Sequence, residues 1–173
     1  MTTHTARATA SYLIAFLDFT LFDKQSQRVD DAEIAETLDA HYQRVTQAVR
    51  AAGGRVIKFI GDATMLVFPE SSVDAGVRAI LDLIASENRL MQEKGWDCRL
   101  QAKAHFGSVI AGEFGAEDDR RFDVFGRAVN ATARLKGTAA FTLSAEAYAR
   151  LASYLQGHFT SQTPVFTYSN SNQ

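Results

Sequence analysis

The chain has 173 residues, of which 46% are hydrophobic and 22% charged, and its formal net charge at neutral pH is −2. These values are ordinary for a globular protein and exclude a low-complexity, disordered or collagen-like chain. The near-neutral charge gives no electrostatic reason to expect a nucleic acid as the partner. A single cysteine, Cys98, excludes an internal disulfide and a cysteine-rich zinc site and favours a reducing compartment.

The length predicts one domain, at roughly 150 residues per domain. We expect it to span residues 11–168, between loose tails at residues 1–10 and 169–173. The longest apolar run near the start, residues 12–17, is too short for a membrane span or the core of a signal peptide. The sequence therefore predicts a cytoplasmic protein with no membrane partner.

The apolar residues of the chain follow two different periodicities. Where they recur at every third or fourth position we expect helices, at residues 30–52, 72–94, 127–136 and 145–155. Short apolar runs bounded by turn residues are typical of strands, at residues 11–19, 55–60, 63–68, 99–107, 109–115, 122–125, 141–144 and 164–168. The order β-α-β-β-α-β with C-terminal additions predicts an α/β (α+β) protein with a ferredoxin-like core.

Two aspartates are expected at one edge of this sheet. Asp18 ends the first strand. The strands at residues 55–60 and 63–68 are joined by Gly61–Asp62, which predicts a hairpin with Asp62 in its turn. The first and third strands are neighbours in a ferredoxin-like sheet, so these carboxylates can meet, and they repel each other unless a cation lies between them. Mg²⁺ and Mn²⁺ prefer oxygen ligands, and phosphoryl chemistry often uses two such ions. The alternative is that each aspartate serves only as a turn residue.

Four segments carry a more specific pattern: FLDFTLF, GGRVIKFIGDATMLVF, HFGSVIAGEFG and RRFDVFGRAVNATARL. In this order they resemble, respectively, the two metal-binding segments, the glycine-bearing strand pair and the substrate and transition-state segment of class III nucleotidyl cyclases. The resemblance covers residues 12–150. It implies the nucleotide cyclase fold, a ferredoxin-like core that pairs head to tail as a homodimer.

The resemblance also implies a role for each residue of the metal and phosphate region. Asp18 and Asp62, with the backbone carbonyl of Phe19, match the ligands of two Mg²⁺ or Mn²⁺ ions. Phe22, in the loop after the first strand, is expected to contact the substrate. Within that loop Leu21 replaces a glycine, and we expect a changed loop shape because leucine disfavours positive φ.

Four further residues match the family's substrate-reading positions. Lys58 and Asp123 match the pair that reads adenine in adenylate cyclases, where guanylate cyclases usually carry Glu and Cys. A lysine donates to N1 of adenine and an aspartate accepts from its amino group, whereas guanine presents the opposite pattern. Asn130 and Arg134 match the residues that orient ribose and stabilise the transition state, and a spacing of four places them on one helix face.

Each of these four residues also has a structural alternative. Lys58 can be a solvated strand lysine, and Asp123 can form a surface ion pair with the preceding arginines. Asn130 can cap or pack within its helix, and the Arg134 stem can cover apolar surface.

The sequence supports two hypotheses about function. The first is an adenylate cyclase that makes cyclic AMP and pyrophosphate from ATP at a site shared between two subunits. One subunit then supplies the metal-binding aspartates and the other the base-reading and transition-state residues. The second is a cyclase-like domain of low activity that binds nucleotide or a protein partner, suggested by Leu21 and by Asp23, which replaces a small hydroxyl residue beside the phosphates.

Overall fold

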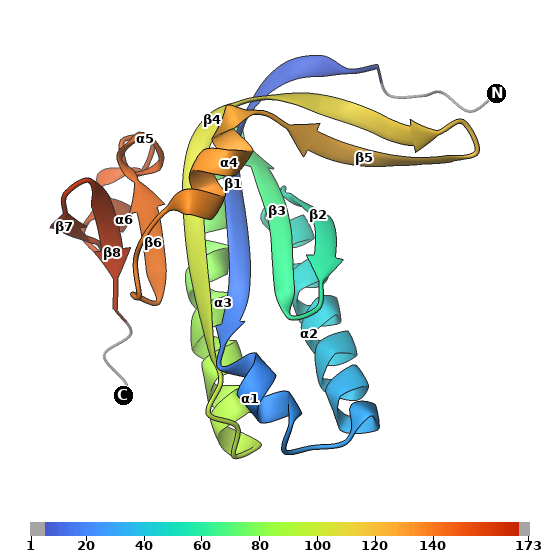
Figure 1. Cartoon of the computed structure of the whole chain (residues 1–173). Coiled ribbons are helices and arrows are strands. Elements are labelled where there is room, and N and C mark those ends of the chain that lie inside the picture. The colour runs from blue at the N-terminus through green and yellow to red at the C-terminus, as the bar shows by residue number, and fades with distance from the viewer. Residues whose placement is uncertain (1–5, 170–173) are drawn as a thin grey trace.

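Strand β1 (Ala8–Thr20) forms the centre of the sheet in the computed structural model, which describes residues 6–169 (Figure 1). It pairs antiparallel with β3 (Ala63–Pro69) on one side and with β4 (Arg99–Ala116) on the other. β2 (Arg55–Ile60) pairs with β3, so the strand order through this half is β2-β3-β1-β4. The predicted ferredoxin-like arrangement is therefore confirmed.

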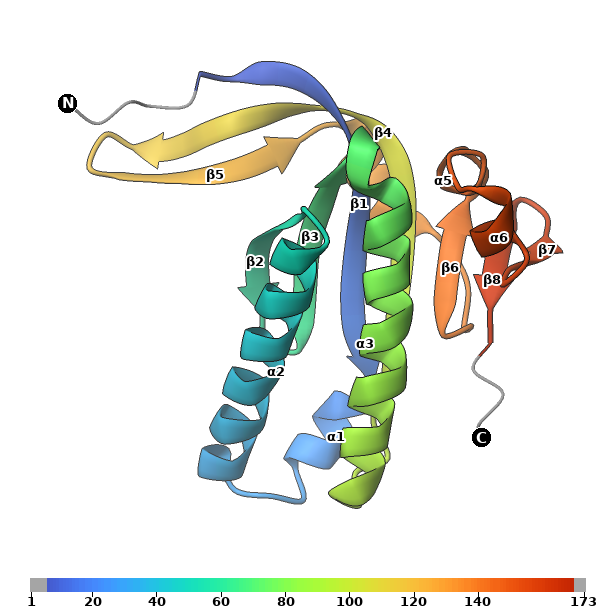
Figure 2. The same ribbon diagram turned by 180° about the vertical axis from the view of Figure 1, so that it is seen from behind.

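Two long helices cover one face of this sheet (Figure 2). α2 (Asp31–Ala51) and α3 (Val73–Glu93) each present an apolar stripe, and together with β1, β3 and β4 they enclose the main core. The side chain of Asp30 caps α2 by accepting the amide of Glu33 at 2.8 Å. The short helix α1 (Phe22–Ser26) follows β1, and a single 3₁₀ turn, Glu70–Ser72, precedes α3.

The opposite face of the sheet is largely open, and of the described helices α4 (Arg127–Arg134) packs on it (Figure 1). A smaller apolar cluster lies there, including Ile14, Met65 and Ala128. A Cβ added at Gly107 would lie 2.7 Å from the Cβ of Ala128. Gly107 is thus the residue that lets α4 approach the sheet closely, and it sets the position of the residues that α4 carries.

The two strands predicted at residues 99–107 and 109–115 are one strand, β4. Gly107 does not interrupt it, because Gly107 is paired with Tyr12 and the pairing with β1 runs unbroken from Ala8↔Ala111 to Thr20↔Arg99. Beyond the body of the sheet, β5 (Asp119–Phe125) pairs back onto β4. The resulting hairpin projects as a long arm (Figure 1).

The C-terminal part extends the sheet beyond β4 in the order β6-β8-β7. The helix predicted over residues 145–155 is divided in two, because Ala152 is extended and donates its amide to Asp74 on α3 at 3.0 Å. Strand β7 was not predicted from the sequence. The elements of this part are β6 (Phe141–Ser144), α5 (Ala145–Tyr148), α6 (Ser153–Gln156), β7 (Thr160–Gln162) and β8 (Val165–Tyr168).

The expected N-terminal tail of residues 1–10 is too long, since residues 8–10 belong to β1 and pair with residues 109–111 of β4. Residues 1–5 of this tail, and residues 170–173 of the expected C-terminal tail, lie outside the described part of the chain. Among the helices of residues 6–169, none combines the length and the apolar composition needed to cross a membrane.

Candidate active site

The two aspartates predicted at the sheet edge do meet. Asp18 lies near the end of β1, and Asp62 is in the two-residue turn between Ile60 and Ala63. The backbone amide of Phe19 donates to Oδ2 of Asp62 at 3.3 Å, which ties the turn to β1. The strand order of the sheet is what brings together these two segments.

Their electrostatics differ from those of ordinary surface carboxylates. Desolvation by the surrounding protein, and then the charge of Asp62 and a hydrogen bond with it, raise the pKa of Asp18 to about 6. Lys103, on β4, lowers the pKa of Asp18 in part. Ionisation of Asp18 is therefore less favourable than that of an ordinary surface carboxylate, and a nearby cation would favour it.

The donors present at this edge fit a hard divalent cation. They are two carboxylates, with the carbonyl of Phe19 in the same segment, and no group of three or more His, Cys, Asp or Glu residues suited to a metal occurs within residues 6–169. A tetrahedral zinc site needs more nitrogen or sulfur donors than this. Mg²⁺ is typically held by one or two carboxylates, with waters and substrate phosphates completing its octahedron.

Lys58 and Asp123 are 65 positions apart in the chain and form an ion pair, Nζ to Oδ2 at 2.5 Å. The second carboxylate oxygen of Asp123 accepts the amide of Val124 at 2.8 Å. Arg121 pairs with Asp119 rather than with Asp123. Within the chain Asp123 therefore pairs with Lys58 rather than with Arg121, and a lysine and an aspartate are presented side by side.

Asn130 and Arg134 lie one turn apart on α4, and both are exposed. Nε of Arg134 donates to the backbone carbonyl of Asn130 at 3.2 Å. Neither the Asn130 amide nor the terminal nitrogens of Arg134 hydrogen-bond to another described residue. Both groups are thus available to a molecule that approaches α4.

The loop between β1 and α1 keeps a conformation that glycine favours. Leu21 has φ 58° and ψ 18°, and within residues 6–169 it is the one residue other than glycine with positive φ. This costs an L-residue about 1–2 kcal/mol. The expectation that Leu21 would avoid this conformation is wrong.

Phe22 begins α1 and packs inward. Its ring lies 6.3 Å from that of Phe19 and 6.2 Å from that of Trp96, between centroids, at the edge of the main core. The Phe22 side chain is therefore directed away from a substrate, and the predicted substrate contact at Phe22 would have to come from its backbone.

Two residues near the aspartates were not identified from the sequence. Lys103 lies close enough to Asp18 to affect its pKa. The strand register could have identified it, since Asp18 pairs with Gln101 and Lys103 lies two residues further along β4. The hydroxyl of Tyr42 donates to the carbonyl of Gly61 at 2.5 Å. Its position within the helix predicted over residues 30–52 gives no sign of this contact.

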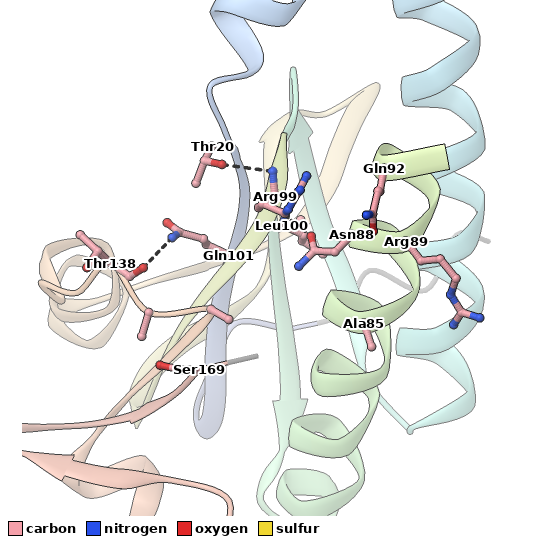
Figure 3. A pocket seen from close by; sticks show the side chains of 12 residues that line it. Thr20, Ala85, Asn88, Arg89, Gln92, Arg99, Leu100, Gln101, Thr138 and Ser169 are labelled. Carbon is pink, nitrogen blue, oxygen red and sulfur yellow. Dashed lines mark hydrogen bonds between the residues drawn. The ribbon is translucent and has the colours of Figure 1, made fainter. Parts of the chain in front are cut away.

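A cleft of about 620 Å³ lies elsewhere, between α3, the first residues of β4 and the loop before β6 (Figure 3). Gln101 donates to the carbonyl of Thr138 across it at 2.9 Å, while the Arg89 side chain points away from Thr20. None of the predicted site residues lines this cleft. Asp18 and the α4 residues instead belong to the open side of the sheet.

Comparison with known proteins places this geometry in a family. The model of the "Adenylate and Guanylate cyclase catalytic domain" matches residues 5–167. Over 129 residues the chain is 30% identical to "Adenylate cyclase 2" of Rhizobium meliloti (strain 1021), which covers 70% of this chain and 35% of that protein. It is 28% identical over 140 residues to "Adenylate cyclase" of Anabaena cylindrica, a match that covers 76% of this chain and 28% of that protein. The chain thus spans about a third of these relatives.

Solved structures share the fold. The adenylyl cyclase CyaB from P. aeruginosa superposes with a TM-score of 0.82 at 17% identity, covering 97% of this chain and 98% of that one. The guanylyl cyclase Cya2 superposes with a TM-score of 0.74 at 15% identity, and the match covers 96% of each chain. Cyclases named for either base have this fold, so the fold does not choose between them. The matched domain, the sheet order and the segments seen in the sequence agree: this chain belongs to the class III nucleotidyl cyclases, the adenylate and guanylate cyclase catalytic domain family.

Proposed function

We propose that this chain is an adenylate cyclase domain, which converts ATP to cyclic AMP and pyrophosphate. The observation that carries the choice of ATP is the contact between Lys58 and Asp123. An adenine edge presents an acceptor at N1 and a donor at its amino group, which the lysine and the aspartate complement. Guanine would leave these groups unpaired, at a cost of roughly 1–3 kcal/mol for each buried group.

The reaction is an attack of the ribose 3′-oxygen on the α-phosphorus, with loss of pyrophosphate. Asp18, Asp62 and the carbonyl of Phe19 would hold Mg²⁺ or Mn²⁺. Such ions, when bound, lower the pKa of the attacking hydroxyl and draw charge from the phosphates. Asn130 would orient the ribose, and Arg134 would meet the negative charge that grows on the α-phosphate in the transition state.

The site is shared between two chains paired head to tail. One chain then contributes the aspartates, and its partner contributes the Lys58–Asp123 pair and the α4 residues. The open sheet face supports this, together with large apolar side chains beside the site: Ile60, Ile110 and Phe125 are 61%, 43% and 49% exposed. Exposed apolar surface of this kind marks an interaction site, and a symmetric dimer buries the same patch on both subunits.

Complementation between inactive variants tests the shared site. Asp62→Asn and Arg134→Ala each remove one half of the site. In a random mixture half of the dimers are mixed, and each of these has one intact site of two, so about a quarter of wild-type activity should return. Asp62→Asn mixed with Asp18→Asn is the matched control, because both changes affect the same half and no intact site forms. No recovery in the first mixture, with subunit exchange demonstrated, would contradict the shared site.

Product assays test the substrate. Cyclic AMP from ATP, at a higher rate per chain as protein concentration rises, is the expected result with Mn²⁺ or Mg²⁺. A folded chain that binds a non-cyclisable ATP analogue and forms no cyclic product from ATP or GTP would instead support the binding module. The positive φ of Leu21 does not favour that alternative, since the loop keeps a glycine-like conformation.

A further inference from the structure

The turn that carries Asp62 is fixed to helix α2. It has two residues, and Gly61, the first, has φ 60°, as hairpin turns of the primed types require. The peptide that joins Gly61 to Asp62 is the central one of the turn. Types I′ and II′ differ chiefly by rotation of this peptide. The hydroxyl of Tyr42 donates to its carbonyl oxygen at 2.5 Å.

We propose that Tyr42 is a positioning residue for the metal-binding carboxylate of Asp62; this rests on the proposed function of the aspartate pair. By holding the Gly61 carbonyl, Tyr42 fixes the rotation of the central peptide, and therefore the direction in which Asp62 leaves the turn. On the other side, the amide of Phe19 donates to Oδ2 of Asp62 at 3.3 Å, and this hydrogen bond further restricts the direction of the carboxylate. The carboxylate is thus held from both sides.

The tyrosine is itself held in place. Its ring stacks on that of Phe59 in β2, with centroids 3.9 Å apart and an angle of 19° between the planes. Desolvation, and then the charge of the nearby Asp62, raise the pKa of the Tyr42 hydroxyl. The hydroxyl therefore reaches the turn from a ring that has little freedom to move.

The preceding residue of α2 contacts the other metal-binding segment. The buried ring of His41 lies 4.9 Å from that of Phe19, and its Nδ1 is 3.2 Å from the carboxylate of Glu87 on α3. Arg44 binds the same carboxylate through two hydrogen bonds, of 2.6 and 3.0 Å. Consecutive residues of one anchored helix thus contact both segments that supply metal ligands.

A purely structural role predicts a different result from a positioning role. The Gly61 carbonyl is at the exposed surface, so water can replace the hydroxyl, and phenylalanine keeps the stacked ring. Tyr42→Phe should therefore leave the metal-free melting temperature close to that of the wild type. Removal of a group that orients a metal ligand typically weakens metal affinity or activity about 10–100-fold.

The test is the Mn²⁺ dependence of the melting temperature of the full chain, measured without nucleotide. Tyr42→Phe should raise the half-saturating Mn²⁺ concentration about 10-fold or more. Tyr148→Phe is the matched control, because Tyr148 also stacks on a phenylalanine, with centroids 3.6 Å apart, but lies in the C-terminal part. Turnover of Tyr42→Phe should recover at high Mn²⁺, whereas that of Asp62→Asn should not.

Two outcomes would overturn the proposal, and they differ from each other. If Asp62→Asn loses the Mn²⁺ response and Tyr42→Phe keeps the wild-type midpoint, the metal site stands and the role of Tyr42 is wrong. If the wild type itself shows no Mn²⁺ response that depends on Asp62, the proposed metal site fails and the role of Tyr42 fails with it.

Discussion

The two charged pairs of the candidate site are built in opposite ways. Asp18 and Asp62 bring like charges together, and the pKa of Asp18 rises to about 6 as a result of desolvation and of this neighbour. Lys58 and Asp123 bring opposite charges together at 2.5 Å and neutralise each other within one chain. On the proposed function, a cation completes the first pair and a base separates the members of the second.

This contrast has consequences for stability and for function. A substitution that removes charge from the aspartate pair should relieve repulsion in the folded chain while it removes a metal ligand. A substitution in the Lys58–Asp123 pair should instead break a favourable contact and change which base is accepted. Without ligand, the Asp18–Asp62 pair therefore destabilises the folded chain, whereas the Lys58–Asp123 pair does not.

The largest expected effect is the loss of turnover in Asp18→Asn or Asp62→Asn. A catalytic cation contributes several kcal/mol to the transition state, and each 1.36 kcal/mol is tenfold in rate, so we expect a loss of about 10³-fold or more. Cyclic AMP formation at saturating Mn²⁺ measures it. Circular dichroism and thermal melting in EDTA serve as controls and should show an intact fold. Rates near those of the wild type in either variant would refute the metal site.

A loss of about 10²–10³-fold in kcat is expected for Arg134→Ala, because a donor to developing charge acts in the transition state. The KM for ATP should change much less. Arg127→Ala is a suitable control, since Arg127 is also an exposed arginine of α4 but lies two turns earlier. Equal losses in both variants would mean that the helix surface, rather than Arg134, matters.

A change of base preference is expected from Lys58→Glu combined with Asp123→Cys. Each unpaired buried group costs roughly 1–3 kcal/mol, so the ratio of kcat/KM for ATP and GTP should shift toward GTP by about 5–150-fold per group. Lys58→Glu alone should be worse than the double variant, because a glutamate would then face Asp123. If the double variant keeps the wild-type ratio, these two residues do not read the base.

The sequence predicted the parts of this site that follow from strand order. The turn at Gly61 and the strand over residues 11–19 were enough to predict that Asp18 and Asp62 lie together, since the first and third strands of this fold are neighbours. The spacing of Asn130 and Arg134 likewise gave a shared helix face. These are local patterns combined with one topological rule.

Contacts that depend on three-dimensional register were beyond sequence reasoning. The resemblance named Lys58 and Asp123 as a pair, but their direct contact follows from the β4–β5 hairpin, which places β5 beside β2 with Val124 paired to Ala111. Gly107 looked like an interruption of a strand, yet its lack of a side chain serves the close approach of α4. Tyr42 has the periodicity of a core residue, and nothing in that periodicity shows where its hydroxyl points.

The smallest expected effect is a pH dependence of stability in the metal-free chain. The pKa of Asp18 is about 6 in the folded chain, against an ordinary value of 3.8. Between these values the folded chain keeps a proton that the unfolded chain has released, so the free energy of unfolding falls as pH rises from about 4 to 6. Above pH 6 the contribution of Asp18 is constant and unfavourable.

Asp18→Asn isolates this contribution from those of other groups. Glu87, whose pKa is lowered, acts in the opposite direction, but it is present in both proteins and cancels in the difference. In EDTA the melting temperature of the variant relative to the wild type should therefore rise between pH 4 and pH 7. Solvent screens the exposed Asp18, so we expect only a few degrees. Saturating Mn²⁺ should reverse the order of the two proteins at pH 7, because the wild type gains a bound cation that the variant has lost. A difference that does not vary with pH would show that neither desolvation nor Asp62 raises the pKa of Asp18 in solution, and the contrast between the two charged pairs would then be lost.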